Sequence, residues 1–384
     1  MIWLMLVSFF LLLISWMTKK LHQTFGILVL ICLLFGIGLG YFHQIPPLKV
    51  IRALSEIPLI LFLFLDGVRL HFPKIIHFHE EAFKQMTWGF FIQAFLGLLL
   101  AHYLLALPWL SSTLLACALS AIDLKAAPTP LQDKKIPPRI SQILNLESSA
   151  TSLFAVTLFM IFHERAILPL VIPAILGVSL GFLVVYLANG ALKRHLAHRS
   201  FLISSLFVAP FALFYLCQTY EWNGYIGVVA LSLTLGHAGR SLCDGLFDLG
   251  RRQGKLLFFL FIITFGCQIL GSLAHTLTLM MILYAFLSLF VIRFIGVLVS
   301  FSKVQFRIRT VLFCSLFGPR ALIPAALALL MLPYNFPVYA TLYGTVLLSL
   351  VVHTLFSFAL TQWYGNFDRE EGKKEFLPTV LFPD

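Results

Sequence analysis

Long apolar stretches, separated by short polar ones, repeat along this chain from its beginning almost to its end. A helix needs about 20 mostly apolar residues to cross a bilayer. These stretches would make residues 1–364 one transmembrane domain, with residues 365–384 as a short cytoplasmic tail. The pattern therefore predicts an all-α polytopic membrane protein with about 13 transmembrane helices, at residues 2–18, 25–43, 54–71, 86–107, 109–127, 140–162, 166–189, 200–218, 224–239, 255–274, 276–299, 308–331 and 338–362.

The composition agrees with that pattern. Of the 384 residues, 60% are hydrophobic and 11% are charged, whereas a soluble domain is about 25% charged. The six cysteines form no CxxC pair, which argues against a disulfide framework or a structural metal. The sequence also lacks the nucleophile, zinc and phosphate-binding motifs of the common enzyme classes. We therefore expect no enzyme activity, no catalytic residue and no cofactor.

Positive charges alternate strongly from one predicted loop to the next. Of the 27 Lys and Arg residues, 21 lie after odd-numbered spans or in the tail, and three lie after even-numbered spans. Cytoplasmic loops carry the excess of Lys and Arg, which places the N-terminus outside and the C-terminus in the cytoplasm. We expect a retained first span and a bacterial-type cell inner membrane. Because the net charge of +11 is loop charge, the expected partner is the lipid bilayer and no nucleic acid.

A few ionisable side chains fall inside the predicted spans. Each costs about 2.5–3.5 kcal/mol at membrane depth, so each is a candidate for function. Asp66 lies near the end of span three, where we expect it to close the helix at the cytoplasmic face. The other candidates, within spans five, six, eleven and twelve, are Asp123, Lys125, Glu147, Arg293 and Arg320.

One face of span six is polar. At about 100° per residue, five polar residues fall within about 160° of the helix circumference, and the remainder of the helix is apolar. Hydroxyl groups in a membrane helix often only pack against a neighbour or bond to backbone carbonyls. Five polar residues around a glutamate favour a polar cavity instead. The residues of this face are Asn145, Glu147, Ser148, Thr151 and Ser152.

Spans five and twelve share signs of a broken helix. Span five contains Asp123 and Lys125 and is followed by two prolines, whereas span twelve contains Gly318-Pro319 and then Pro324. The two spans are seven apart in the chain, so they run in opposite directions across the membrane. Broken helices at corresponding positions of an inverted repeat indicate the midplane binding site of a secondary transporter.

Four segments together resemble the NhaP type of sodium/proton antiporter, in the monovalent cation:proton antiporter family. "LFLFLDGVRLHF" (61–72) is similar to the third-span signature of that family, and "ALSAIDLKAA" (118–127) to its first crossing helix. "LNLESSATSLF" (144–154) is similar to its G-E-S-L-L-N-D helix, and "LFGPRALIPAALAL" (316–329) to its second crossing helix. The resemblance implies NhaA/NhaP-like inverted repeats with two discontinuous crossing helices, and a core bundle that moves against a dimerising scaffold, hence a homodimer.

The match retains some functional residues of the family and loses others. Asp123, Glu147, Ser148 and Arg320 stay, and the resemblance implies that Arg320 ties the second crossing helix to the glutamate helix. A glutamate beside Arg320 would be held ionised, as a structural tie more than a proton carrier. Three departures stand out. The Thr-Asp-Pro of the family is Ile122-Asp123-Leu124 here, and the valine that follows it is Lys125. The Asn-Asp pair of the family is Thr151-Ser152.

Lys125 allows two interpretations. Its side chain extends to the cytoplasmic surface, or it occupies the place of the cation and pairs with Asp123 or Glu147. In the second case a buried lysine exchanges protons without a metal, or transport is lost.

Two functional hypotheses follow. In the first, the chain exchanges Na⁺, or K⁺ or Li⁺, for H⁺ by alternating access. Its ion-binding and proton-carrying residues are then Asp123, Glu147, Ser148, Thr151 and Ser152, with the crossing-helix charge partners Lys125, Arg320 and Arg293. In the second, the antiporter fold has lost cation coupling together with the aspartate at position 152, and serves another solute, an uncoupled proton path or a sensor.

Overall fold

Helices account for the regular structure of this computed structural model, and no strand occurs among the residues it describes. The described residues are 2–21, 25–71, 80–124, 136–164, 166–273, 278–302, 306–331 and 338–367. The first nine elements are α1 (Ile2–Leu21), α2 (Phe25–Tyr41), α3 (Leu48–Arg69), α5 (Glu80–Lys84), η2 (Gln85–Gly89), α6 (Phe90–Leu105), α7 (Trp109–Ser120), α9 (Pro138–Glu164) and α10 (Leu168–Lys193). The remainder are α11 (Arg199–Leu206), α12 (Val208–Thr219), α13 (Gly224–Ala238), α14 (Arg240–Leu273), α15 (Leu279–Phe286), η4 (Leu287–Ile292), α16 (Arg293–Ser300), α17 (Ile308–Leu316), α18 (Leu322–Met331) and α19 (Tyr339–Phe367).

The predicted spans coincide with these helices. Each of the thirteen overlaps one helix or a run of consecutive ones, although the number of membrane crossings stays a prediction. The helices that are long and apolar enough to cross a membrane by length and composition are 80–105, 138–164, 168–193, 201–219, 279–300 and 339–365. The domain boundary at residue 364 is untested; α19 continues to Phe367, and residues 368–384 of the predicted tail lie outside the described chain.

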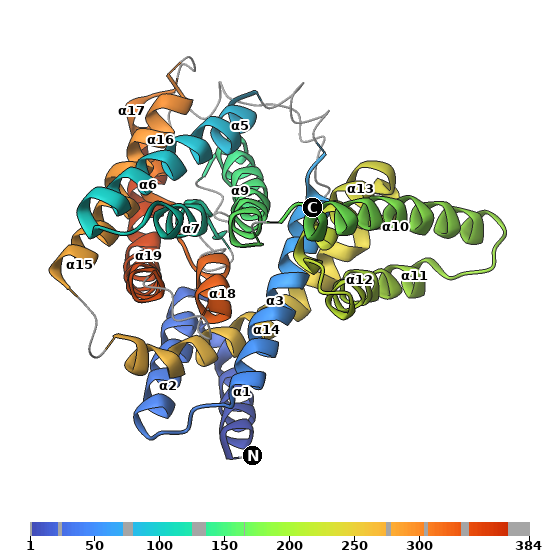
Figure 1. Cartoon of the computed structure of the whole chain (residues 1–384), viewed down its shortest axis with the longest axis horizontal. Coiled ribbons are helices and arrows are strands. Elements are labelled where there is room, and N and C mark those ends of the chain that lie inside the picture. Colours follow the sequence, from blue (N-terminus) through green and yellow to red (C-terminus); the bar gives the residue numbers. More distant parts are fainter. Residues whose placement is uncertain are drawn as a thin grey trace.

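Two groups of helices are visible in the fold (Figure 1). The helices of spans four to six gather with those of spans eleven to thirteen: α6 packs on α7, α7 on α9, and α15 on both α6 and α19. We call this group the core bundle. The other helices surround α3 and α14, and α10–α13 project from them as an arm.

Both broken spans are confirmed, the first at a shifted position and the second at the predicted Gly318-Pro319. Span five leaves the helix at Ala121, which is extended, rather than at Asp123 to Lys125. In span twelve, α17 ends at Leu316 and α18 begins at Leu322. A further difference concerns residues 240–254, predicted as a loop, which form the start of the long helix α14. Their basic and acidic residues masked the helical pattern in a hydropathy analysis.

Spans four and eleven, again seven apart, share a second irregularity. Each contains a π-helical turn, η2 in span four and η4 in span eleven. π-helical turns are rare and are frequent at functional sites. Because spans four and eleven correspond in the predicted inverted repeat, the shared kind of turn supports that repeat, although η2 opens its span and η4 lies in the middle of its span.

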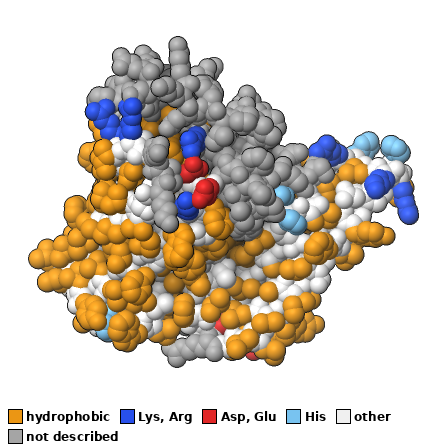
Figure 2. Space-filling view, turned by 90° about the horizontal axis from the view of Figure 1, so that it is seen from above, with side chains coloured by type: hydrophobic (Ala, Val, Ile, Leu, Met, Phe, Trp, Pro, Cys, Tyr) orange, Lys and Arg blue, Asp and Glu red, His pale blue; other side chains and the backbone are white. Residues whose placement is uncertain are grey.

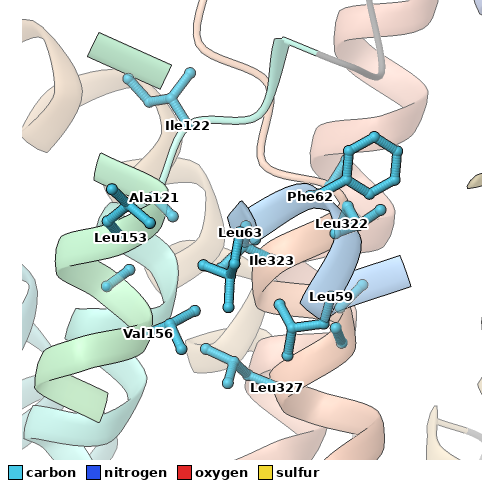
Figure 3. Close-up of a cluster of buried hydrophobic side chains, with 14 of the residues drawn as sticks. Leu59, Phe62, Leu63, Ala121, Ile122, Leu153, Val156, Leu322, Ile323 and Leu327 are labelled. Carbon is cyan, nitrogen blue, oxygen red and sulfur yellow. The ribbon is translucent and has the colours of Figure 1, made fainter. Parts of the chain in front are cut away.

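Apolar side chains fill the space between the two groups. Figure 3 shows Leu59 and Leu63 of α3, Val156 of α9, and Ile323 and Leu327 of α18 in one buried cluster. Hydrophobic side chains also cover most of one outer face, while charged ones gather near one edge and at the end of the arm (Figure 2). Such a surface suits lipid, because lipid tails solvate apolar side chains.

Candidate functional site

The two interrupted spans meet inside the core bundle. The backbone N–H of Asp123 donates to the Pro319 carbonyl at 2.7 Å, and the Leu322 N–H donates to Asp123 Oδ2 at 2.7 Å. Asp123 therefore caps the N-terminus of α18, where a carboxylate also interacts favourably with the helix dipole. The side chain is fully buried. This contact joins the two halves of the chain through residues that no pattern in the sequence pairs.

The polar face of α9 lies against the first unwound segment. Ser148 Oγ accepts from the Leu124 N–H at 3.3 Å and donates to the Ile122 carbonyl at 3.1 Å. Thr151 Oγ1 accepts from the Ile122 N–H at 3.2 Å. Backbone groups without a helical partner must be satisfied inside a membrane, so these two hydroxyls hold the broken helix open beside Asp123.

Two further members of that face bond within their own helix. Ser152 Oγ donates to the Ser148 carbonyl at 2.8 Å and is fully buried. Asn145 donates to the Ser141 carbonyl at 2.8 Å and is only half-buried. Ser152 thus occupies the position of the lost aspartate without a bond to either crossing segment among the described residues.

Glu147 pairs with Arg293 and not with Arg320, which corrects the partner expected from the sequence. Both carboxylate oxygens accept from the Arg293 guanidinium, through Nη1 to Oε1 and through Nη2 to Oε2 at 2.9 Å. Gln85 of η2 also donates to Oε1 at 2.7 Å. Arg293 Nη2 continues to the Cys314 carbonyl at 3.1 Å, so α9, α16 and α17 are tied at one point. Gly318 leaves room for the Arg293 side chain, because a Cβ at position 318 would lie only 2.9 Å from Arg293 Nε.

Arg320 ties the second unwound segment to different neighbours. Its guanidinium donates to the Ser288 hydroxyl at 2.5 Å and the Ser288 carbonyl at 2.7 Å, both on η4. Its backbone N–H donates to Ser349 Oγ of α19 at 2.8 Å. The tie between the second crossing helix and the glutamate helix that the resemblance implied for Arg320 is therefore wrong, because the guanidinium bonds to η4 instead. Only the tertiary fold decides which of two arginines reaches Glu147.

Asp66 lies within α3, which continues to Arg69, and so does not end the helix as predicted. It is buried at 1% exposure and accepts a hydrogen bond from Ser149 of α9 at 3.2 Å. Ser149 in turn accepts from Arg69 Nη1 at 3.4 Å. Lys125 lies outside the described residues, so both interpretations of this lysine remain predictions.

Sequence analysis missed four polar residues of this region: Gln85, Ser288, Ser349 and His353. Each is buried. A signal was present for the last two, since polar residues recur every fourth position from Thr341 to Thr361. Gln85 and Ser288 carry no such signal, because a single polar residue in an apolar span is common.

The site combines a buried carboxylate with hydroxyl and carbonyl oxygens. Such oxygens suit a hard cation, and a carboxylate also binds a proton, so the two compete for one group. Among the described residues, no group of three or more His, Cys, Asp or Glu side chains is placed to hold a metal ion. The competition of a cation and a proton for one carboxylate suits transient ion binding.

Comparison with known proteins identifies the family. The sequence profile of the sodium/hydrogen exchanger transmembrane family matches residues 5–363, nearly the whole chain. This chain belongs to the sodium/hydrogen exchanger family. Its membership identifies it as a membrane transporter that exchanges cations for protons. Among curated proteins, none matches the chain significantly.

Solved structures support the fold of this exchanger. A structure of the sodium proton antiporter MjNhaP1 from Methanocaldococcus jannaschii at pH 8 has a TM-score of 0.71 and 18% identity, covering 95% of this chain and 99% of that one. An electron-microscopy structure of the same antiporter has a TM-score of 0.74 and 19% identity, covering 98% and 97%. At such low identity the likeness establishes the fold, and the residue roles have to come from this chain.

Proposed function

We propose that this exchanger couples the passage of a monovalent cation, Na⁺ first and K⁺ or Li⁺ as further candidates, to the opposite passage of protons. The observation that carries the proposal is Asp123, a buried carboxylate where two unwound segments cross. Broken helices that meet at a buried acid are the usual ion site of secondary transporters. Transport by alternating access then follows if the core bundle moves against the remaining helices.

The residues of the site divide into two roles. Asp123 is the group for which cation and proton compete, and Ser148 and Thr151 shape the segment around it and supply oxygens, with Ser152 nearby. Glu147 is assigned to structure, because both of its oxygens are held by Arg293 and one also by Gln85. Arg320 fixes the second unwound segment on η4.

The setting of the exchanger follows from the same argument. We expect it to work in a lipid bilayer, without a cofactor and without enzyme activity, as a homodimer with its N-terminus outside. A bacterial-type inner membrane and a cytoplasmic C-terminus remain our proposals from the charge pattern. The apolar outer surface supports the bilayer setting (Figure 2).

The test is proton flux in proteoliposomes that contain a pH-sensitive dye under an imposed pH gradient. Addition of Na⁺, K⁺ or Li⁺ to vesicles that contain the wild-type protein should release protons from their interior. The variant Asp123→Asn should abolish that release. Ser55→Ala is the matched control, because Ser55 is a buried hydroxyl that bonds within α3, to the Ile51 carbonyl. Wild-type vesicles that respond to none of the three cations would contradict the proposal and favour the uncoupled alternative.

A further inference from the structure

A stripe of polar side chains runs along α19, which packs against α15 and α18. Neighbouring members, four residues apart, lie one above the other, so the stripe winds gradually around the helix. One of them is a histidine, buried at 7% exposure, in a helix that otherwise carries no ionisable side chain over that stretch except tyrosine. The members, all buried, are Thr341, Thr345, Ser349, His353, Ser357 and Thr361.

The internal repeat relates this stripe to the polar face of α9. In the first repeat, Ser148 Oγ accepts from the Leu124 N–H, four residues after the end of α7. In the second repeat, Ser349 Oγ accepts from the Arg320 N–H, four residues after the end of α17. The same bond, from the same position of the unwound segment to a serine of the following helix, therefore occurs twice.

By this correspondence, His353 in the second repeat is equivalent to Ser152 in the first. Each lies four residues after its serine, and each bonds back to the carbonyl of that serine: Ser152 Oγ to Ser148 O at 2.8 Å, and His353 Nδ1 to Ser349 O at 2.9 Å. Position 152 is where the family resemblance expects the missing aspartate. The chain thus has a titratable side chain at the equivalent position of its second repeat.

We propose that His353 binds a transported proton, so that the proton-carrying role of the missing carboxylate at position 152 has passed to the symmetry-related position on α19. This inference rests on the proposed antiport function. The step is proton uptake by the imidazole from one side of the membrane and its release to the other. On uptake an O–H bond of hydronium breaks as the N–H bond forms, and on release the N–H bond breaks as water takes the proton.

The surroundings of the ring suit both of its protonation states. Nδ1 lies 2.9 Å from the Ser349 carbonyl, which accepts from a protonated nitrogen, and 3.2 Å from Ser349 Oγ, which donates to a bare one. Gain or loss of the proton therefore leaves no partner of Nδ1 unsatisfied.

The charges around the ring provide coupling. The positive charges of Arg320 and Arg293 repel a protonated His353, and Glu147 neutralises the charge of Arg293. Ser349 also connects the ring to the Arg320 N–H, between Pro319 and Leu322, which both bond to Asp123. A cation at Asp123 and a proton at His353 then oppose each other. Among the side chains that the structure describes, the other ionisable groups on the helices packed against α19 are Tyr284 of α15, Cys314 and Arg309 of α17, Cys117 of α7, Cys32 and Tyr41 of α2, and Cys243, Lys255 and Cys267 of α14.

The experiment compares wild-type, His353→Asn and His353→Gln in the dye-loaded proteoliposomes across a range of pH. We expect both variants to lower cation-dependent proton release by about tenfold or more and to flatten its pH profile. Ser357→Ala is the control, because Ser357 lies one turn further along the same buried stripe. Restoring the acid in Ser152→Asp with His353→Asn should recover the coupling, a result that a merely structural histidine would not give.

Two further outcomes decide the inference separately from the function. If wild-type vesicles exchange cations and both histidine variants keep the wild-type rate and pH profile, the role of His353 is wrong and the antiport function stands. Absence of wild-type exchange contradicts the function itself, and with it the transported proton. Potentiometric titration of the solubilised protein should show one proton fewer bound by His353→Asn across the pH range in which the protein stays folded; equal titration curves overturn the inference. Gel filtration and thermal unfolding check that each variant is folded.

Discussion

At the scale of single residues, Glu147 and Arg293 form an ion pair in which both side chains are buried. Their side chains are 0% and 1% exposed. Two charges removed from water are tolerated only when they are paired and hydrogen-bonded, and removal of one partner costs about 3–5 kcal/mol. The contact therefore acts on stability before it acts on transport.

We predict that Glu147→Leu and Arg293→Leu each lower the thermal midpoint of the detergent-solubilised protein strongly. The double variant should be more stable than either single one, because it leaves no unpaired charge. Glu56→Gln serves as the control, since its partner Arg52 is 55% exposed and such pairs contribute little. A double variant with the summed loss of both single variants would contradict this account.

At the scale of elements, α2 and α14 pack through glycines. A Cβ at Gly36 would lie 2.3 Å from the Ile263 carbonyl, and one at Gly40 would lie 2.5 Å from the Cys267 carbonyl. Small residues four apart allow close backbone approach of membrane helices, where packing rather than water drives association. Gly38 on the same helix has no atom within 4 Å of that position.

We predict that Gly36→Val separates α2 from α14 and lowers the thermal midpoint and the yield of folded protein. Gly38→Val, on the other side of the helix, should leave both close to wild type. The measurement is thermal unfolding with gel filtration, on proteins purified side by side. Equal behaviour of the two variants would show that the close approach of α2 to α14 does not determine stability.

At the scale of the whole molecule, the fold combines a core bundle with a second group of helices and an arm (Figure 1). The end of the arm, between α10 and α11, carries Lys193, Arg194, His195, His198 and Arg199. The positive-inside rule places this turn in the cytoplasm and the turn after α12 outside. The side of the membrane on which each end of the arm lies therefore gives the orientation of the whole chain.

We predict that a membrane-impermeant maleimide added to intact cells labels Tyr220→Cys and spares Leu196→Cys, and that permeabilised cells allow both to react. Leu196 is 75% exposed and precedes α11, whereas Tyr220 is 60% exposed and follows α12, so the two positions lie at opposite ends of this helix pair. The wild-type chain is the control, because its six free cysteines are buried. The reverse labelling pattern would invert the predicted topology.

The sequence by itself determined the fold class, the position of most helices and the two broken spans. These follow from local properties: hydropathy over about 20 residues, prolines and glycines that interrupt helices, and motif resemblance. It also identified Asp123 and the polar face of α9, because a charge or a polar face inside an apolar span stands out.

Only the tertiary structure decided which side chains meet. Glu147 bonds to Arg293 rather than Arg320, and Asp123 caps α18, which lies almost 200 residues further along the chain. Neither pairing leaves a trace in local sequence, because helices that are far apart in the chain are brought together by packing over the whole bundle. The equivalence of Ser152 and His353 has the same origin, since it emerges only when the two repeats are compared bond by bond.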